Sequence, residues 1–219
     1  MTENLPVIAV IGGTGAEGSG LAARWAHAGY RVIVGSRNAD NALETAKEIG
    51  AEGMDNAAAA ATCNIAVLTV PFAAQRATLI SLREVLQGKI LVDVTVPLVP
   101  PKVMRVRLPE EGCAALIAQS VLGDDVRVVS AFQNVSASHL KDPDYVVDCD
   151  VLITGDDPAA RGEVVRLAAA AGLIGIEAGP LDNAVAAEAM TSLLIWMNRK
   201  YKSPGAGIRI TALPAKSEL

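Results

Sequence analysis

Aromatic residues and histidines are scarce in this chain of 219 residues, which contains 3% Phe, Trp and Tyr and two histidines. Because 51% of the residues are hydrophobic, the core must be built from Ala, Val, Leu and Ile, as in parallel sheets covered by helices. The three cysteines lie far apart, and no Cys-x-x-Cys or Cys/His cluster occurs. The sequence therefore predicts no metal site and no disulfide framework, and we expect reduced thiols in a cytoplasmic protein.

The sequence also lacks an excess of positive charge and long apolar runs. A net charge of -5 argues against nucleic acid as a partner, since binding a polyanion needs a basic surface. No run approaches the roughly 20 apolar residues that a membrane helix needs. The N-terminal residues also lack the basic and then apolar pattern of a signal peptide. We expect neither nucleic-acid nor membrane partners.

Short apolar runs alternate with helical periods along the chain. The predicted strands cover 7–11, 31–34, 65–70, 89–96, 127–132, 151–154 and 174–177. The predicted helices cover 20–29, 39–49, 56–61, 73–86, 113–122, 159–171 and 181–201. This order predicts an α/β fold with a Rossmann-type, doubly wound, mostly parallel sheet and a small C-terminal α/β subdomain. Residues 97–109 hold four prolines and are predicted to form a loop at the carboxyl end of a strand, where such sheets bind ligands.

The glycine-rich turn after the first predicted strand carries the clearest motif. Gly13-x-Gly15-x-x-Gly18 follows strand 7–11 and opens a predicted helix, which is the context of the dinucleotide fingerprint. The first glycine permits the tight turn, the second lets the pyrophosphate approach the backbone, and the third lets the helix pack close to the strand. Free N–H groups and the positive end of the helix dipole then bind the pyrophosphate. An ordinary glycine-rich turn is the alternative, and the position in a βαβ unit favours nucleotide binding.

The end of the second predicted strand selects the cofactor. Proteins that bind NAD usually place Asp or Glu there, to accept hydrogen bonds from the ribose 2′-hydroxyl. This chain has Ser36 and Arg37 instead, so no carboxylate repels a 2′-phosphate. A hydroxyl and the planar donor fork of arginine suit such a phosphate. We expect NADP(H), with the beginning of a solvated loop as the alternative role of these two residues.

Collinear segments along nearly the whole chain resemble the NADPH-dependent coenzyme F420 reductases (F420:NADP oxidoreductases). The matching segments are 11–20, 34–37, 66–71, 97–100, 128–131, 178–183 and 207–209. The proline loop and the C-terminal half discriminate best, because the nucleotide motifs recur in a wider class of reductases. The resemblance implies an NADP-binding Rossmann domain over residues 1–135. It also implies a small subdomain over 136–219 that completes a cleft for the deazaflavin.

By the same resemblance, hydride passes directly between NADP(H) and coenzyme F420, and no side chain has a catalytic role. Such a step depends on the alignment of two rings more than on a proton donor. The positions that match the family's NADP contacts are Thr14, Gly15, Ala16 and Glu17 at the pyrophosphate, Ser36 and Arg37 at the 2′-phosphate, Val70 and Pro71 at the nicotinamide, and Ala137.

Two positions depart from the family pattern. Gln133 stands where the family has a histidine beside the deazaflavin, and Asn41 replaces a basic residue near the 2′-phosphate. An amide can still hydrogen-bond a ring carbonyl or N–H, but it does not titrate near pH 7. We keep Gln133 as a candidate contact on the acceptor side and Asn41 as a candidate NADP contact. His139 is an alternative source of the imidazole, and another planar acceptor, such as a pterin or a flavin, stays open.

The last predicted helix suggests an oligomer. Met190, Leu193, Leu194 and Met197 recur at helical spacing, with Trp196 beside them. A stripe of this kind is typical of a core or an interface, and we expect a homodimer through this helix.

Two other functions are weighed against the deazaflavin reductase. One is an NADP-dependent reductase of a small oxo or imine substrate, which normally needs a protonating Lys or His in the cleft. The other is a non-enzymatic NADP-sensing protein, whose spacing Gly12-x-x-Gly15-x-x-Gly18 also fits. The proline loop and the match of the C-terminal half disfavour the sensor.

Overall fold

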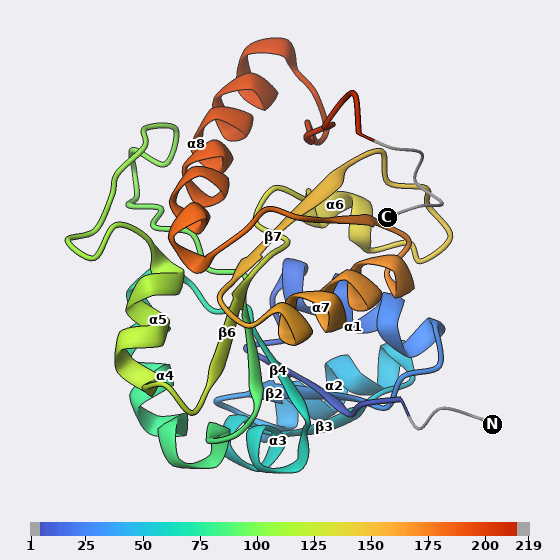
Figure 1. Ribbon diagram of the computed structural model, residues 1–219. Coiled ribbons are helices and arrows are strands. Elements are labelled where there is room, and N and C mark those ends of the chain that lie inside the picture. Colours follow the sequence, from blue (N-terminus) through green and yellow to red (C-terminus); the bar gives the residue numbers. More distant parts are fainter. Residues whose placement is uncertain (1–4, 214–219) are drawn as a thin grey trace.

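A single eight-stranded sheet runs through the computed structural model, which describes residues 5–213 (Figure 1). The strands are β1 (Ile8–Ile11), β2 (Val32–Ser36), β3 (Glu52–Asp55), β4 (Ile65–Leu68), β5 (Ile90–Asp93), β6 (Arg127–Ser130), β7 (Asp150–Gly155) and β8 (Ile174–Glu177). Their order in the sheet is β3-β2-β1-β4-β5-β6-β7-β8. All neighbouring pairs are parallel except β6 and β7, which are antiparallel. The predicted Rossmann-type, mostly parallel α/β fold is confirmed.

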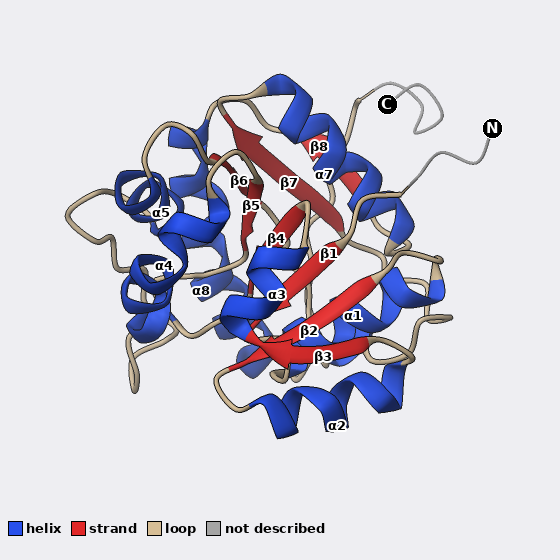
Figure 2. Cartoon of the chain, turned by 90° about the horizontal axis from the view of Figure 1, so that it is seen from below, coloured by secondary structure: helices blue, strands red, loops and turns tan. Residues whose placement is uncertain are grey.

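Helices cover both faces of the sheet (Figure 2). They are α1 (Ala16–His27), α2 (Ala39–Ile49), α3 (Asn56–Thr62), α4 (Phe72–Leu86), α5 (Ala114–Leu122), α6 (Ala137–Leu140), α7 (Pro158–Ala170) and α8 (Ala184–Tyr201), with a 3-10 turn at Leu181–Asn183. Residues alternate along each strand, so Val10 packs toward α1, α2 and α7, whereas Ile11 packs toward α3, α4 and α5. Two aliphatic cores result, one on each face.

The carboxyl ends of β1, β2, β4, β5 and β6 meet at one edge because these strands are parallel. The chain leaves β1 toward β2 on one side and later returns to β4 on the other, so the strand order reverses between β1 and β4. Open α/β sheets bind ligands at such a reversal. Within residues 5–213, no helix is long and apolar enough to cross a membrane.

The first helix corrects one boundary. It spans Ala16–His27, whereas the sequence pattern predicted 20–29. Gly18 and Gly20 lie inside it because neighbouring segments approach too closely for a side chain, and a Cβ on Gly20 would lie 2.6 Å from the Leu140 Cβ. The glycines therefore serve close packing and do not delay the start of the helix.

Two short elements escaped prediction. Strand β3 lies at the edge of the sheet and lacks apolar alternation, and its Gly53 packs against the backbone of α2. Helix α6 has only four residues, too few for a periodic pattern. The last predicted helix is split into the 3-10 turn and α8.

Side chains of α1 connect the segments on either side of residue 135. The buried guanidinium of Arg24 donates hydrogen bonds to five carbonyl oxygens, those of His139, Leu140, Asp142, Tyr145 and Ala171. The indole N–H of Trp25 donates to the carbonyl oxygen of Leu167 over 2.8 Å. Strands β7 and β8 extend the same sheet, and the division into residues 1–135 and 136–219 stays a prediction.

Candidate active site

The turn between β1 and α1 is as tight as its glycines allow. Gly12 has φ +76°, and the N–H of Gly13 donates to the carbonyl oxygen of Gly35 over 2.9 Å. A Cβ on Gly13 would lie 2.7 Å from the Val10 oxygen, and a Cβ on Gly18 would lie 2.8 Å from the Gly13 Cα. Gly15 differs, since its Cβ would meet only the Gly12 oxygen at 3.7 Å. The backbone above Gly15 is therefore open to a ligand, as the motif predicts.

The N-terminus of α1 has no side-chain cap. Gly15 occupies the N-cap position, so no side-chain oxygen satisfies the N–H groups of the first turn. Thr14, Gly15 and Ala16 are exposed there. Free amides and the positive end of the helix dipole attract an anion at this point.

Glu17 is the acidic residue in the first turn of α1. Its Oε1 atom is buried and has no hydrogen-bond partner. Burial raises the pKa of this carboxyl to about 8. A carboxyl group that is neutral near pH 7 thus lies beside the predicted phosphate site.

The end of β2 lies next to the turn through the Gly13–Gly35 hydrogen bond. Ser36 is buried, and its Oγ accepts from the N–H of Asn38 over 3.3 Å. Arg37 and Asn41 are exposed at the start of α2, whose N-cap is Asn38. The structure thus places all three predicted 2′-phosphate contacts around one helix start.

The segment after β4 borders the turn on its other side. The N–H of Thr69 donates to the Ile11 oxygen over 2.9 Å, and Val70 contacts Gly12, where a Cβ would lie 2.6 Å from its Cγ1. Pro71 follows, exposed, as the N-cap of α4. Ala137 begins α6, which packs against α1. The predicted contacts at 13–18 and 70–71 therefore lie around the start of α1, and Ala137 begins a helix that packs against α1.

Gln133 follows a strained residue at the end of β6. Phe132 has φ +72°, a conformation that is rare for a bulky residue. The Gln133 side chain is buried, and its Nε2 donates to the carbonyl oxygen of Asp93 and to Ser130 Oγ. Its backbone oxygen accepts from Thr191 Oγ1 over 3.1 Å. Gln133 therefore ties the carboxyl ends of β5 and β6 to α8.

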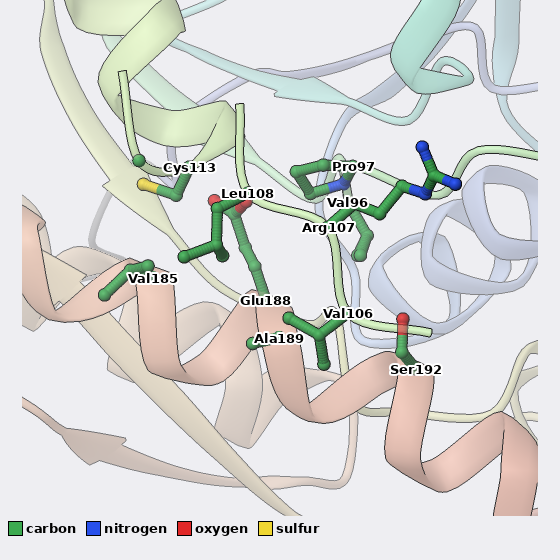
Figure 3. Close-up of a pocket in the computed structure, with 11 residues that line it drawn as sticks. Val96, Pro97, Val106, Arg107, Leu108, Cys113, Val185, Glu188, Ala189 and Ser192 are labelled. Atoms are coloured by element: carbon green, nitrogen blue, oxygen red, sulfur yellow. The ribbon is translucent and has the colours of Figure 1, made fainter. Parts of the chain in front are cut away.

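A narrow pocket lies between the proline loop and α8 (Figure 3). Val106 and Leu108 face Val185 and Ala189 of α8, and the guanidinium of Arg107 points away from them. The pocket has space for about one water molecule. Glu188 lies at its floor and accepts hydrogen bonds from the N–H groups of Ala114 and Ala115, at 2.7 and 3.0 Å.

Buried polar residues near this pocket were missed by the sequence reasoning. Burial raises the pKa of Glu188 to about 8, although the two amides act in the opposite direction. Burial also raises the pKa of Asp93 to about 6; this carboxylate accepts from Gln75 Nε2 at 2.5 Å and from the Thr95 N–H at 2.9 Å. The sequence did carry a signal for each of them: Asp93 is an acid at the carboxyl end of an apolar strand, and Glu188 is an acid within an apolar helix face.

Comparison with known proteins gives consistent matches. Residues 7–97 match the family model described as NADP oxidoreductase coenzyme F420-dependent. The F420-dependent NADP reductase of Methanocaldococcus jannaschii is 42% identical over 94% of this chain and 98% of its own length. The enzyme of the same name from Methanothermobacter marburgensis is 43% identical over 94% of this chain and 99% of its own.

The chain belongs to the family of F420-dependent NADP reductases. The resemblance predicted from the sequence is therefore confirmed, and with it the class of NADP-dependent oxidoreductase. A crystal structure of a putative F420-dependent NADP-reductase from an Arthrobacter species has a TM-score of 0.84 at 26% identity, over 95% of this chain and 100% of that one. A pyrroline-5-carboxylate reductase from Coxiella burnetii has a TM-score of 0.62 at 14% identity, over 89% of this chain and 67% of that one. This likeness shows the shared fold.

Proposed function

We propose that this chain transfers a hydride between NADP(H) and the deazaflavin of coenzyme F420. The observation that carries the proposal is the uncapped N-terminus of α1 beside Ser36 and Arg37, in a chain about 42% identical over its length to F420-dependent NADP reductases. An open glycine turn suits a pyrophosphate, and an exposed arginine in place of a carboxylate suits a 2′-phosphate.

The nucleotide would lie along the carboxyl edge of the sheet. The residues that would hold the pyrophosphate are Gly13, Thr14, Gly15, Ala16, Glu17 and Gly18. Ser36, Arg37 and Asn41 would surround the 2′-phosphate at the start of α2. Val70 and Pro71 would border the nicotinamide, because Val70 packs against Gly12 of the turn, and Ala137 at the start of α6 would contact NADP(H).

The acceptor would enter between the proline loop and α8, next to Gln133. The present space of about one water molecule is too small for a tricyclic ring, so the proline loop would move away from α8 to admit it. Gln133 would shape the acceptor side by holding β5, β6 and α8 together. Direct hydride transfer needs this alignment, and we assign no side chain to proton transfer.

The assembly and cellular context belong to the same proposal. Leu193, Trp196 and Tyr201 of α8 are 50%, 48% and 70% exposed, and we propose that a second copy of the chain covers them in a homodimer. We also propose that the protein acts in the cytoplasm and binds no nucleic acid, as its charge and buried thiols suggest.

The test is a direct assay. Purified protein is mixed with NADPH and oxidised F420, and the loss of F420 absorbance is followed; the reverse direction uses reduced F420 and NADP⁺. We expect turnover in both directions with NADP(H) and much slower turnover with NAD(H). Tight binding of NADPH without any F420 turnover would overturn the proposal and favour an oxo or imine substrate or a sensor.

A further inference from the structure

Glu17 places an acid where the fold prepares a site for phosphate. Its neighbours Gly15 and Gly18 form the open turn and the close helix contact, and the helix start has no side-chain cap. An ionised carboxylate there would repel a pyrophosphate and would occupy the positive end of the helix dipole in its place. A neutral carboxylic acid would do neither.

The carboxyl of Glu17 is directed into the protein. Its Oε1 atom is buried and unpartnered, and the side chain lies close enough to the Cys149 thiol to help raise the pKa of that thiol. Cys149 stands just before β7, whose antiparallel course extends beyond the carboxyl edge of the sheet. One oxygen of the carboxyl is therefore buried between the phosphate turn and the start of β7. A buried carboxyl with an unpartnered oxygen favours its protonated form.

Other charged groups on the surrounding elements are engaged or remote. Arg24 of α1 is occupied by carbonyl oxygens, and Asp148 pairs with Arg209. The carboxylate of Asp150 accepts from the Ile210 N–H, and His139 of α6 stacks on Tyr145. Farther away, Glu163 and Arg166 of α7 lie near Tyr30, beyond the other end of α1, and the charged residues of α2 are Asp40, Glu44, Lys47 and Glu48. Cationic partners for Glu17 are not found among these described groups.

We propose that Glu17 accompanies bound NADP(H) as the neutral carboxylic acid, so that dinucleotide binding takes up one proton at this residue wherever the free protein carries it ionised. The inference rests on the proposed function only in placing the pyrophosphate at this turn. The proton comes from solvent, and no bond to the dinucleotide is formed or broken.

The direction of the pH dependence follows from the free protein. Because burial raises the pKa of Glu17 to about 8, the acid is mostly protonated near pH 7, and affinity is flat there. Above that pKa the dissociation constant rises by up to about tenfold per pH unit, until the pKa of Glu17 in the complex is reached. The dinucleotide raises that second pKa further, since its negative charge favours the neutral acid.

The experiment is a fluorescence titration with NADPH between about pH 7 and about pH 9.5, above the second pKa of the 2′-phosphate. The wild-type dissociation constant should rise at least about tenfold across this range. Glu17→Gln should bind with nearly constant affinity and should bind more tightly than the wild type at the upper end. In weakly buffered solution near pH 9, a pH indicator should report about one proton taken up per NADPH by the wild type and almost none by Glu17→Gln.

Matched variants isolate the residue. Glu84→Gln removes an exposed carboxylate in the last part of α4 and should keep the wild-type slope. His139→Gln removes the nearby imidazole and should keep it too. A wild-type slope in Glu17→Gln, or a flat wild-type titration, overturns the inference. Circular dichroism of each variant distinguishes a binding effect from a folding effect.

The proposed function and this inference fail separately. Proton-linked NADPH binding without F420 turnover would refute the hydride-transfer proposal and leave the role of Glu17 intact. Turnover together with proton-independent binding would do the reverse.

Discussion

The side-chain amide of Gln133 donates a hydrogen bond to the carbonyl oxygen of Asp93, 3.2 Å away. The bond joins the carboxyl ends of β5 and β6 at the edge where the two substrates would meet. Gln133, which the resemblance aligns with a histidine of the family, therefore directs its amide N–H groups to other protein atoms. Its backbone oxygen accepts a hydrogen bond from the Thr191 hydroxyl.

Replacement of Gln133 by Leu should lower the free energy of unfolding by about 1–3 kcal/mol, because the Asp93 oxygen and the Ser130 hydroxyl lose their buried donor. Urea denaturation measures this loss. Gln87→Leu, at the exposed C-cap of α4, should cost less than about 1 kcal/mol. Equal losses in the two variants would contradict a specific role for the buried amide.

Replacement of Arg37 by Asp should weaken NADPH binding by about 10- to 100-fold and leave NADH binding nearly unchanged. The guanidinium is exposed at the start of α2, where it can meet a 2′-phosphate, and a charge-assisted hydrogen bond contributes about 1.5–3 kcal/mol. Titration of both nucleotides against the variant measures the ratio. If the two affinities fell together, Arg37 would not be the residue that selects NADP(H).

The folded protein should be less stable at about pH 9 than at about pH 6. Glu17 and Glu188 have pKa values raised to about 8, and Asp93 to about 6, all above their values in an unfolded chain. Folding thus retains protons on these groups, so their contribution is full below the unfolded pKa values and is lost as pH rises through about 6 to 8. Thermal melts across this range measure the fall in Tm. Glu17→Gln should reduce the fall, and a Tm that rises toward pH 9 would be incompatible with these pKa shifts.

Replacement of Arg24 by Met should destabilise the protein by more than about 3 kcal/mol, since five buried or partly buried carbonyl oxygens lose their common donor. Arg24→Lys should recover only part of this loss, because an ammonium group lacks the planar fork. Denaturant unfolding compares the two variants. Wild-type stability in Arg24→Met would show that water replaces the guanidinium at little cost.

The sequence predicts the sheet and the phosphate turn because both depend on local patterns. Apolar runs such as 65–70 read as buried strands, and Gly13 and Gly18 occupy positions where neighbouring backbone leaves no room for a side chain. The pocket at the proline loop could be anticipated only as a location. Its floor is formed by Glu188, which meets the start of α5 across 73 residues of sequence, and no local pattern encodes that contact.

Burial also decides what a sequence motif leaves open. Glu17 reads as an exposed residue of a helix start, whereas in the fold its Oε1 atom is buried and its carboxyl lies near the Cys149 thiol, just before β7. Likewise, Gln133 reads as a substitute for a histidine that faces a ligand, whereas the left-handed turn at Phe132 leads into a side chain that bonds to the strands.

The hydrogen bonds of Arg24 and Trp25 also limit when the fold can be completed during synthesis of the chain. Helix α1 leaves the ribosome early, yet its guanidinium and indole find their acceptors only when residues 139–171 have followed. Until then, two large polar side chains of the first helix stay solvated, and the face of the sheet that α7 will cover stays open. The hydrogen bonds that anchor α1 to the rest of the fold can therefore be complete only after about three quarters of the chain has been translated.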